Sequence, residues 1–235
     1  MTLHDQLMAA VGEHRGLAAA DQLCVACVML FDVDAAAISA VFDGTNMGTV
    51  GVSSSSARRY DELQFTYGEG PCLDAVELRA PVACSDLAHP RELRWPAFRP
   101  ALVADTIRSV YAAPVVVAGE YVGALDLFRT LPGDWPAETS AGALMVAQLA
   151  TVPFMDLLAE DSVAAISDPT SDAWAELSQF ARAEVSQATG MLVAQLDVTP
   201  SQALVRLRAH AYATGRSATD VARDIIEHRL RLDAD

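Results

Sequence analysis

Two β-prone runs separated by only three residues limit what this chain can fold into more than any other feature. Ile107–Val117 and Tyr121–Phe128 are rich in Val, Ile, Tyr and Phe, which favour strands. The residues between them, Ala118-Gly119-Glu120, suit a tight turn, so the two runs are predicted to pair as an antiparallel hairpin. An antiparallel sheet is therefore the expected centre of the first part of the chain.

A second hairpin and several helices are predicted around this sheet. The second hairpin pairs Ala35–Phe42 with Met47–Ser53, because Asp43-Gly44-Thr45-Asn46 is a turn signal. The other expected elements are one or two helices in Leu3–Leu30, helices at Ser54–Tyr67 and Cys72–Leu78, a strand at Val82–Cys84, a loop and helix over Pro90–Val103, and a helix over Thr139–Asp161 with a kink or break at Pro153. A central antiparallel sheet with flanking helices, gathered at its ends and on one face, makes an α+β sandwich, which we assign to residues 1–160.

The chain changes character after residue 160. Residues 161–172 contain Ser, Asp and Pro and are typical of a junction, and residues 173–235 are predicted to be all-α, with three helices. The long first helix has an apolar seam that slips by one position along its length: Trp174, Leu177, Ala181, Val185, Ala188 and Leu192. This seam suits a parallel two-helix coiled coil, and an ordinary amphipathic helix remains the alternative because the seam is short.

Clear start and stop signals mark the other two helices. Thr199 is a good N-cap, and Gln202 completes a capping box with it. Pro200 stands at the first helical position, and Gly215 is suited to end this helix. The last helix begins with a second capping box at Ser217-Ala218-Thr219-Asp220. Because three short helices bury little apolar surface by themselves, we expect a homodimer formed through the long helix.

Lysine is absent from the chain, and all 16 basic residues are arginine. A Walker-type phosphate loop, a Schiff-base site, a kinase and a phospho-receiver domain all need a lysine, so these classes are excluded. The net charge of −15 argues against indiscriminate binding to nucleic acid or to anionic membranes. However, residues 1–181 contain 9 arginines and 24 acidic residues, whereas residues 182–231 contain 7 arginines and 5 acidic residues. The C-terminal helices are therefore the part that suits an anionic partner.

The segment Val185–Leu232 resembles an ANTAR domain. The matching residues are Ala188-Thr189-Gly190-Met191-Leu192 on the long helix, Ala203-Leu204-Val205-Arg206-Leu207-Arg208 on the second, and Gly215-Arg216 and Asp220-Val221-Ala222 at the third. The first domain resembles a GAF domain of the kind fused to ANTAR domains in actinobacterial regulators. Its matching residues are Leu63-Gln64, Gly68-Glu69-Gly70-Pro71-Cys72, Asp86-Leu87, Arg94-Trp95-Pro96, Pro114 and Gly123-Ala124-Leu125.

These resemblances imply an RNA-binding transcription antitermination regulator. ANTAR domains are similar in using three helices, as a dimer, to bind a tandem hairpin in nascent mRNA, which prevents a terminator from forming. The GAF domain would be the sensor. Arginine suits such a partner, since it forks onto phosphate and stacks on the unpaired bases of hairpin loops. The expected RNA-binding residues are Thr189, Gly190, Arg206, Arg208, His210, Tyr212, Arg216 and Arg223.

Three points bear on this set of residues. From spacing alone, the arginines could instead solvate the helices and pair with Asp220, Asp224 and Glu227. Gly190 costs a helix interior about 1 kcal/mol relative to alanine. A close helix approach or backbone access for RNA would explain this cost, and the alternative is that the helix simply tolerates it. Thr189 also departs from the basic residue that many members of the family have before the glycine.

The first domain offers few groups for chemistry. Cys24 and Cys27 have C-x-x-C spacing but lie in an apolar helical pattern, so packing is favoured over a redox or zinc site. A ligand pocket for a small molecule or protein is expected near Cys72, Arg94, Trp95 and Tyr111, with no cofactor, no metal and no catalytic residue. The alternative function is a GAF-type small-molecule or redox enzyme or sensor, similar to methionine-sulfoxide reductases, in which Cys72 and Cys84 react and the helical tail dimerises.

The N-terminus has no visible secretory signal, and the apolar run Leu23–Phe31 is far too short to span a membrane. Four cysteines without a signal indicate reduced thiols. We therefore expect a cytoplasmic protein with no membrane partner.

Overall fold

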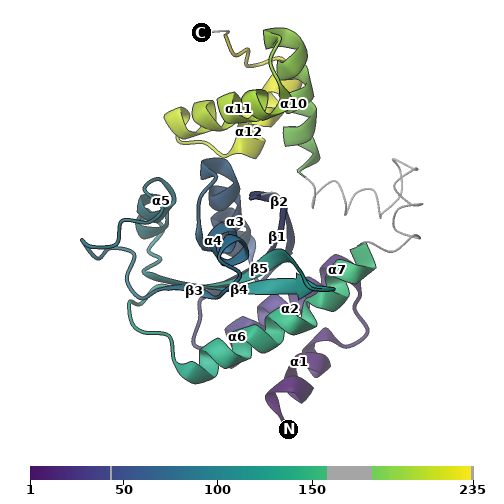
Figure 1. Ribbon diagram of the computed structural model, residues 1–235, viewed down its shortest axis with the longest axis vertical. Helices are drawn as coiled ribbons and strands as arrows, with labels where there is room; N and C mark the ends of the chain where they lie inside the picture. The colour runs from purple at the N-terminus through teal and green to yellow at the C-terminus, as the bar shows by residue number, and fades with distance from the viewer. Residues whose placement is uncertain (43, 158–181, 234–235) are drawn as a thin grey trace.

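The computed structural model describes residues 1–42, 44–157 and 182–233, and it contains an α/β body followed by a module of three helices (Figure 1). The body has one five-stranded sheet in the order β2-β1-β5-β4-β3, with every neighbouring pair antiparallel. The strands are β1 (Ala35–Phe42), β2 (Thr45–Val52), β3 (Val82–Cys84), β4 (Ser109–Val117) and β5 (Glu120–Arg129). Both predicted hairpins are confirmed, although β2 begins two residues earlier than expected.

Helices cover both faces of the sheet, so the prediction that they gather on one face is wrong. One face carries α1 (Leu3–Val11), α2 (Gly16–Leu30), α6 (Ala137–Leu149) and α7 (Thr151–Leu157), and the other carries α3 (Ser55–Tyr67), α4 (Pro71–Glu77) and α5 (Phe98–Ala104). The reason is visible in β1, where Ala36 and Ile38 belong to one apolar cluster while Ala37 and Val41 belong to the other. A strand without polar alternation buries both of its faces.

The predicted interruption of the helix over Thr139–Asp161 occurs at Ala150, between α6 and α7, rather than at Pro153. Pro153 lies in the first turn of α7, where a missing N–H group costs little. The whole stretch Ala137–Leu157 is long and apolar enough to cross a membrane by length and composition alone. Its residues Ala143, Val146 and Phe154 lie in the apolar cluster against the sheet, which is the position of a core helix.

The C-terminal module consists of α10 (Ala183–Leu196), α11 (Pro200–Thr214) and α12 (Ala218–Ile226). Val185, Ala188 and Leu192 are buried among these three helices, so the second half of the predicted seam packs within the module and is not free for a coiled coil. The first half of the seam, and the proposed boundaries of the junction at residues 161–172, lie outside the described residues.

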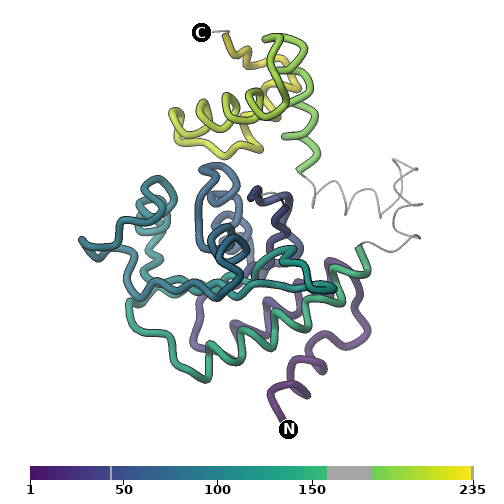
Figure 2. The backbone as a smooth tube through the Cα atoms, in the orientation of Figure 1, coloured from purple at the N-terminus to yellow at the C-terminus, as the bar shows by residue number. Residues whose placement is uncertain are grey.

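The module lies against the outer side of α3, away from the sheet (Figures 1 and 2). Both α11 and α12 contact α3, and Phe65 of α3 is buried in the apolar cluster of the module. Ser54 caps the start of α3, and Gly68 ends the helix in the left-handed conformation (φ 68°). These two signals fix the length of the helix that the C-terminal module contacts.

Candidate nucleic-acid interface and sensor pocket

The three helices of the module are positioned by caps that the sequence encodes. Thr199 and Gln202 form a capping box at the start of α11, and Gly215 ends that helix with φ 64°. Ser217 accepts a hydrogen bond from the backbone N–H of Asp220 at the start of α12. The capping box predicted for α11 is thus confirmed. Of the capping box predicted for α12, the structure shows only the half made by the Ser217 side chain.

Arg208, one of the expected RNA-binding residues, contacts the first domain. Its guanidinium carbon lies 4.4 Å from the centre of the Phe65 ring, a cation–π contact across the two domains. Burial, and the nearby charge of Arg182, lower the pKa of the Arg208 guanidinium to about 10. The buried Nε of Arg208 has no hydrogen-bond partner among the described residues. Arg208 is therefore a partly desolvated cation without a carboxylate partner in the part of the chain that the structure describes.

Tyr212 follows Arg208 by one helical turn and also contacts α3. Its ring meets that of Tyr67 edge-on, with 5.6 Å between the centroids, yet 61% of Tyr212 is exposed to solvent. Arg208 and Tyr212 thus lie on the side of α11 that faces the first domain.

The N-terminus of α12 is occupied by side chains of α3. The buried hydroxyl of Thr66 accepts a hydrogen bond from the backbone N–H of Ala218 at 3.0 Å. The Glu62 carboxylate accepts hydrogen bonds from the backbone N–H and the hydroxyl of Thr219, at 3.2 and 2.8 Å. A helix N-terminus favours anions such as carboxylates and phosphates. Glu62 therefore fills a position that would suit a phosphate.

Arg216 and Arg223 form ion pairs within the module. Arg216 lies 2.7 Å from Asp224, and Arg223 lies 3.3 Å from Asp220 and 3.7 Å from Glu184. Two of these partners are acids that spacing alone had suggested. Both arginines remain substantially exposed, and exposed pairs contribute little stability, so their guanidinium groups can exchange partners at small cost.

The remaining expected RNA-binding residues make no hydrogen bond or ion pair to α3 among the described residues, although Thr189 lines a cavity together with Phe65. Arg206 is partly exposed and donates a long hydrogen bond of 3.5 Å to the Asp233 carbonyl. His210 is half-buried, and the Thr189 hydroxyl donates to the Val185 carbonyl of its own helix. Gly190 is exposed, and a Cβ added there would meet nothing within 4 Å among the described residues. The close helix approach considered for Gly190 is therefore not made in the described part of the chain.

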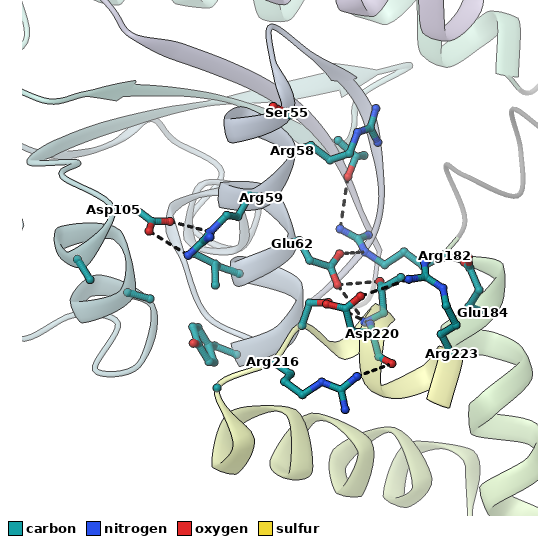
Figure 3. Close-up of a pocket in the computed structure, with 18 residues that line it drawn as sticks. Ser55, Arg58, Arg59, Glu62, Asp105, Arg182, Glu184, Arg216, Asp220 and Arg223 are labelled. Atoms are coloured by element: carbon teal, nitrogen blue, oxygen red, sulfur yellow. Dashed lines mark hydrogen bonds and ion pairs between the residues drawn. The ribbon is translucent and has the colours of Figure 1, made fainter. Parts of the chain in front are cut away.

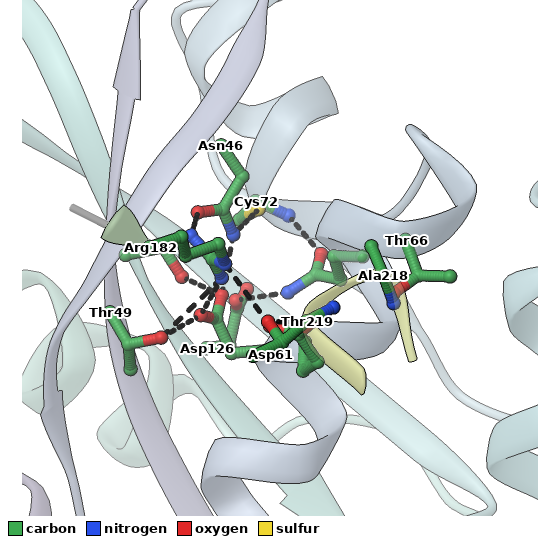
Figure 4. Close-up of polar contacts among 12 residues, drawn as sticks. Asn46, Thr49, Asp61, Thr66, Cys72, Asp126, Arg182, Ala218 and Thr219 are labelled. Atoms are coloured by element: carbon green, nitrogen blue, oxygen red, sulfur yellow. Dashed lines mark hydrogen bonds and ion pairs between the residues drawn. The ribbon is translucent and has the colours of Figure 1, made fainter. Parts of the chain in front are cut away.

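The first domain contains a buried polar cluster in which Asp61 of α3 is central (Figure 4). Asp61 is fully buried and accepts hydrogen bonds from Ser39, Asn46 and Thr49 of the hairpin formed by β1 and β2. Its fourth partner is Arg182, which immediately precedes α10 and whose Nη2 lies 2.9 Å from Asp61 Oδ2. An arginine of the C-terminal segment therefore reaches into the sensor domain.

A second acid and a thiol lie beside Asp61. Asp126 Oδ2 accepts a hydrogen bond of 2.7 Å from Gln64, whereas the buried Asp126 Oδ1 has no partner among the described residues. Burial raises the pKa of the Asp126 carboxyl and of the Cys72 thiol well above their ordinary values. One donor atom each from Asp61, Cys72 and Asp126 lies within 4.8 Å of the others. These donors could hold a metal ion only after Asp126 and Cys72 lose their protons.

A cavity of about 760 Å³ opens between the two domains (Figure 3). It is lined from α3 by Arg58 and Glu62 and from the C-terminal segment by Arg182, Arg216 and Arg223, among others. A second cavity of about 360 Å³ is also lined by Arg182, together with Asn46 and Phe65. The Arg182 side chain thus adjoins two cavities.

The four residues expected to form a ligand pocket are not brought together. Arg94 pairs with Glu92 and lies over the Trp95 ring, while Trp95 Nε1 donates to Asp74. Cys72 belongs to the polar cluster on the α3 face of the sheet. Tyr111 lies on the opposite face, against Trp135. Of the four, only Arg94 and Trp95 are in contact with each other among the described residues.

The cysteines are buried, in agreement with the packing interpretation. Burial raises the pKa of Cys24 well above its ordinary value, that of Cys27 to about 12 and that of Cys84 to about 11. Thiols with such values are almost entirely protonated near neutral pH, and the thiolate is the reactive form.

Sequence reasoning missed the residues that connect the domains: Asn46, Thr49, Asp61, Phe65 and Arg182. One signal was available in α3. Asp61 lies at helical spacing between the buried residues Ala57 and Gln64, so an acid stands on the apolar face of the helix. A buried acid in such a position demands a partner.

The fold and its contacts define a class of protein: a sensor-type α/β domain joined to a small helical module whose arginines lie at the domain boundary. Comparison with known protein families identifies both the α/β domain and the helical module. The chain belongs to the GAF domain family, which matches residues 16–152, and it carries an ANTAR domain at residues 180–226. The protein is therefore a regulator of the RNA-binding antitermination class with a GAF sensor domain, and this architecture points away from an enzyme.

Solved structures agree on the fold of the first domain. The GAF domain of a phosphoenolpyruvate-protein phosphotransferase from Coxiella burnetii is 18% identical, with a TM-score of 0.54, over 68% of this chain and 95% of that one. The corresponding domain from Acinetobacter is 12% identical, with a TM-score of 0.50, over 66% and 92%. A free methionine-R-sulfoxide reductase from Neisseria meningitidis is 14% identical, over 66% and 87%, but its TM-score of 0.49 supports no conclusion about activity. No curated protein matches the sequence.

Proposed function

We propose that this protein binds tandem hairpins in nascent mRNA through its ANTAR domain, prevents a terminator from forming, and is controlled by contact with its GAF domain. The observation that carries the proposal is the burial of Arg208 against Phe65 of the sensor. A side chain suited to phosphate and unpaired bases is thus half-buried, with its guanidinium group held against the sensor domain. Release from the sensor would therefore be needed before Arg208 could contact RNA.

The contacts at α12 support the same control. Glu62 presents its carboxylate to the N-terminus of α12 and to Arg182, with 3.1 Å between Arg182 Nε and Glu62 Oε2. Both are groups that would otherwise suit an RNA phosphate. The Glu62 carboxylate of the sensor thus competes with an RNA phosphate for the same groups of the module.

The RNA-contacting residues that we propose are the set expected from sequence: Thr189, Gly190, Arg206, Arg208, His210, Tyr212, Arg216 and Arg223. In the docked arrangement, Arg208 and Tyr212 meet α3, whereas Gly190, Arg216 and Arg223 are exposed. The exposed members can make a first encounter with RNA before the module leaves the sensor.

The RNA-binding form is proposed to be a cytoplasmic homodimer. The buried positions Val185, Ala188 and Leu192 cannot form its interface while the module keeps its own core. Ser186, Gly190 and Ala194 are exposed at intervals of four residues on α10, which leaves that side of the helix open to a second copy. The enzyme alternative gains no support from the described thiols, which are buried and protonated.

The direct test is binding of the full chain to a fluorescent tandem-hairpin RNA, with a single hairpin and a strand of the same composition without hairpins as controls. We expect the tandem hairpin to bind most tightly, and its affinity to fall as the salt concentration rises. Equal affinity for all three RNAs would contradict the proposed specificity.

A further inference from the structure

The GAF domain contains a complete binding site for a guanidinium group, and the side chain of Arg182 occupies it. Arg182 donates hydrogen bonds to Asp61 Oδ2 at 2.9 Å, Asn46 Oδ1 at 3.0 Å, Glu62 Oε2 at 3.1 Å and Thr49 Oγ1 at 3.5 Å. The guanidinium carbon also lies 4.4 Å from the centre of the Phe65 ring. All five partners belong to the GAF domain, whereas Arg182 lies in the ANTAR domain.

The site is preorganised without Arg182. The Asp61 carboxylate is held on both oxygens by donors of the sensor domain itself: Ser39 and Asn46 at Oδ1 and Thr49 at Oδ2. The edge of a guanidinium group suits carboxylate and amide oxygens, and its face suits an aromatic ring. Only 7% of the Arg182 side chain and none of that of Asp61 is exposed, so the occupant is almost fully desolvated.

The surroundings leave room and an unused acceptor for a different occupant. The buried Asp126 Oδ1, next to Asp61, has no partner among the described residues. Both cavities described above are lined by Arg182, so a molecule larger than a guanidinium head could extend into either of them.

The backbone at Arg182 supports a replaceable occupant. Arg182 has φ 45° and ψ 55°, a left-handed conformation that is uncommon for a residue with a side chain, and it makes no side-chain cap to α10. This conformation persists where the surrounding contacts hold it. Loss of the contacts to Asp61 would remove that restraint.

We propose that the GAF pocket binds a small molecule with a guanidinium or amidinium group, for which Arg182 is the built-in competitor. A free ligand of this chemistry cannot occupy the site together with Arg182, so its binding must displace the arginine. The further consequence, release of the ANTAR domain for RNA, rests on the function proposed above. By linkage, the ligand would raise RNA affinity by the same factor by which RNA raises ligand affinity.

A divalent metal is the competing occupant, through Asp61, Cys72 and Asp126. The metal would require two protons to leave groups whose pKa values are raised by burial. A guanidinium group requires no proton to leave, because it forms its hydrogen bonds to a carboxylate, an amide and a hydroxyl that are already in place. The geometry therefore favours the organic cation.

The test uses full-length Arg182→Ala and N-methylguanidinium chloride at low millimolar concentration, where denaturation by the cation is small. We expect the ligand to raise the thermal midpoint of Arg182→Ala, since binding to the folded state stabilises it, and methylammonium chloride at equal ionic strength to have no effect. The double variant Arg182→Ala/Asp61→Asn lacks the carboxylate of the site, so its thermal midpoint should not change when the ligand is added. Wild type should respond less than Arg182→Ala, because its own arginine competes.

If N-methylguanidinium does not raise the thermal midpoint of folded Arg182→Ala, the guanidinium site is refuted. It is also refuted if zinc chloride raises this midpoint and N-methylguanidinium does not. If Arg182→Ala does not fold, the wild-type protein is titrated with N-methylguanidinium in a calorimeter instead. We expect a heat of binding for wild type and none for Asp61→Asn. RNA binding is measured separately: saturating ligand should tighten RNA binding to wild type by about 5-fold or more. If the ligand binds but RNA affinity does not change, the proposed coupling between the two sites is refuted, whereas the guanidinium site itself is not.

Discussion

Arg208 of α11 stacks on Phe65 of α3, with 4.4 Å between the guanidinium carbon and the ring centre. The same arginine is expected to contact RNA. Arg208 is half-buried against the sensor, and the face of its guanidinium group is taken up by the Phe65 ring. The docked Arg208 therefore cannot also stack on an unpaired base through that face, so docking of the two domains and RNA binding compete for one side chain. Because of this competition, the contact between the GAF and ANTAR domains can control RNA binding.

Phe65→Leu should strengthen RNA binding, because it weakens docking without altering the ANTAR domain. A desolvated cation–π contact contributes about 1–2 kcal/mol, so the RNA affinity should rise by about 5- to 30-fold. Fluorescence anisotropy with the tandem-hairpin RNA measures this change. The matched control is Tyr121→Leu, which removes the cation–π contact between Arg79 and Tyr121, outside the module. Equal effects of the two substitutions would refute a specific role of Phe65.

Arg208→Ala should lower RNA affinity even though it also weakens docking, because the substitution removes the RNA contact itself. A charge-assisted hydrogen bond contributes about 1.5–3 kcal/mol, which is on average more than the roughly 1–2 kcal/mol gained by releasing the cation–π contact. Helicity, measured by circular dichroism, should stay unchanged. An increase in RNA affinity would mean that Arg208 serves only to dock the module.

Arg216→Ala should weaken RNA binding and reduce the slope of log affinity against log salt by about 1, as expected for one lost phosphate contact. The structure offers a close control, because Arg229 pairs with the same Asp224 as Arg216 does. Arg229→Ala should leave the RNA affinity and the salt slope as they are. If both variants behave alike, the effect comes from freeing Asp224 rather than from an RNA contact.

Gly190→Ala should stabilise the folded protein and weaken RNA binding. The added methyl group meets nothing within 4 Å in the described residues, so the gain in helix propensity of about 0.5–1 kcal/mol should appear in urea unfolding. The proposed role of Gly190 in RNA or partner contact predicts the loss of affinity. Gln187→Ala, at an exposed position of α10 outside the row of Ser186, Gly190 and Ala194, is the control. A destabilised Gly190→Ala would instead indicate close packing at this position.

Asp126→Asn should change how stability depends on pH. Burial raises the pKa of Asp126 in the folded protein, so the folded state binds more protons than the unfolded state above the ordinary pKa of 3.8. The contribution of Asp126 to stability is thus present below about pH 4 and falls as the pH rises above it. In urea unfolding, the free energy of unfolding of Asp126→Asn should increase relative to that of wild type between pH 5 and pH 7. A constant difference between the two proteins across that range would contradict this.

Local signals made much of the fold predictable. The hairpin of β4 and β5, the capping box of Thr199 and Gln202, and the left-handed Gly215 are each encoded within a few neighbouring residues. Coverage of both faces of the sheet was missed, although β1 contained the signal: it is apolar on both faces except for Ser39.

The contact between the domains could not be predicted from local patterns. Arg182 and Asp61 are 121 residues apart, and residues 158–181 give no pattern that would bring them together. Arg208 was singled out for its chemistry, but whether it faces RNA, water or Phe65 depends on how the domains dock. Tyr111 was assigned to a pocket by type alone, and the alternation of β4 puts it on the other face of the sheet.

The most direct test of control by the GAF domain is the RNA affinity of full-length Asp61→Asn. This substitution removes the buried partner of Arg182 and leaves every proposed RNA-contacting residue intact. Asp105→Asn, which breaks the exposed pair with Arg59, is the control. Because breaking a buried ion pair costs well over 1.4 kcal/mol, we predict that folded Asp61→Asn binds the tandem hairpin at least about 10-fold more tightly than wild type and Asp105→Asn. Unchanged or weaker binding by folded Asp61→Asn would contradict the control of RNA binding by the sensor domain.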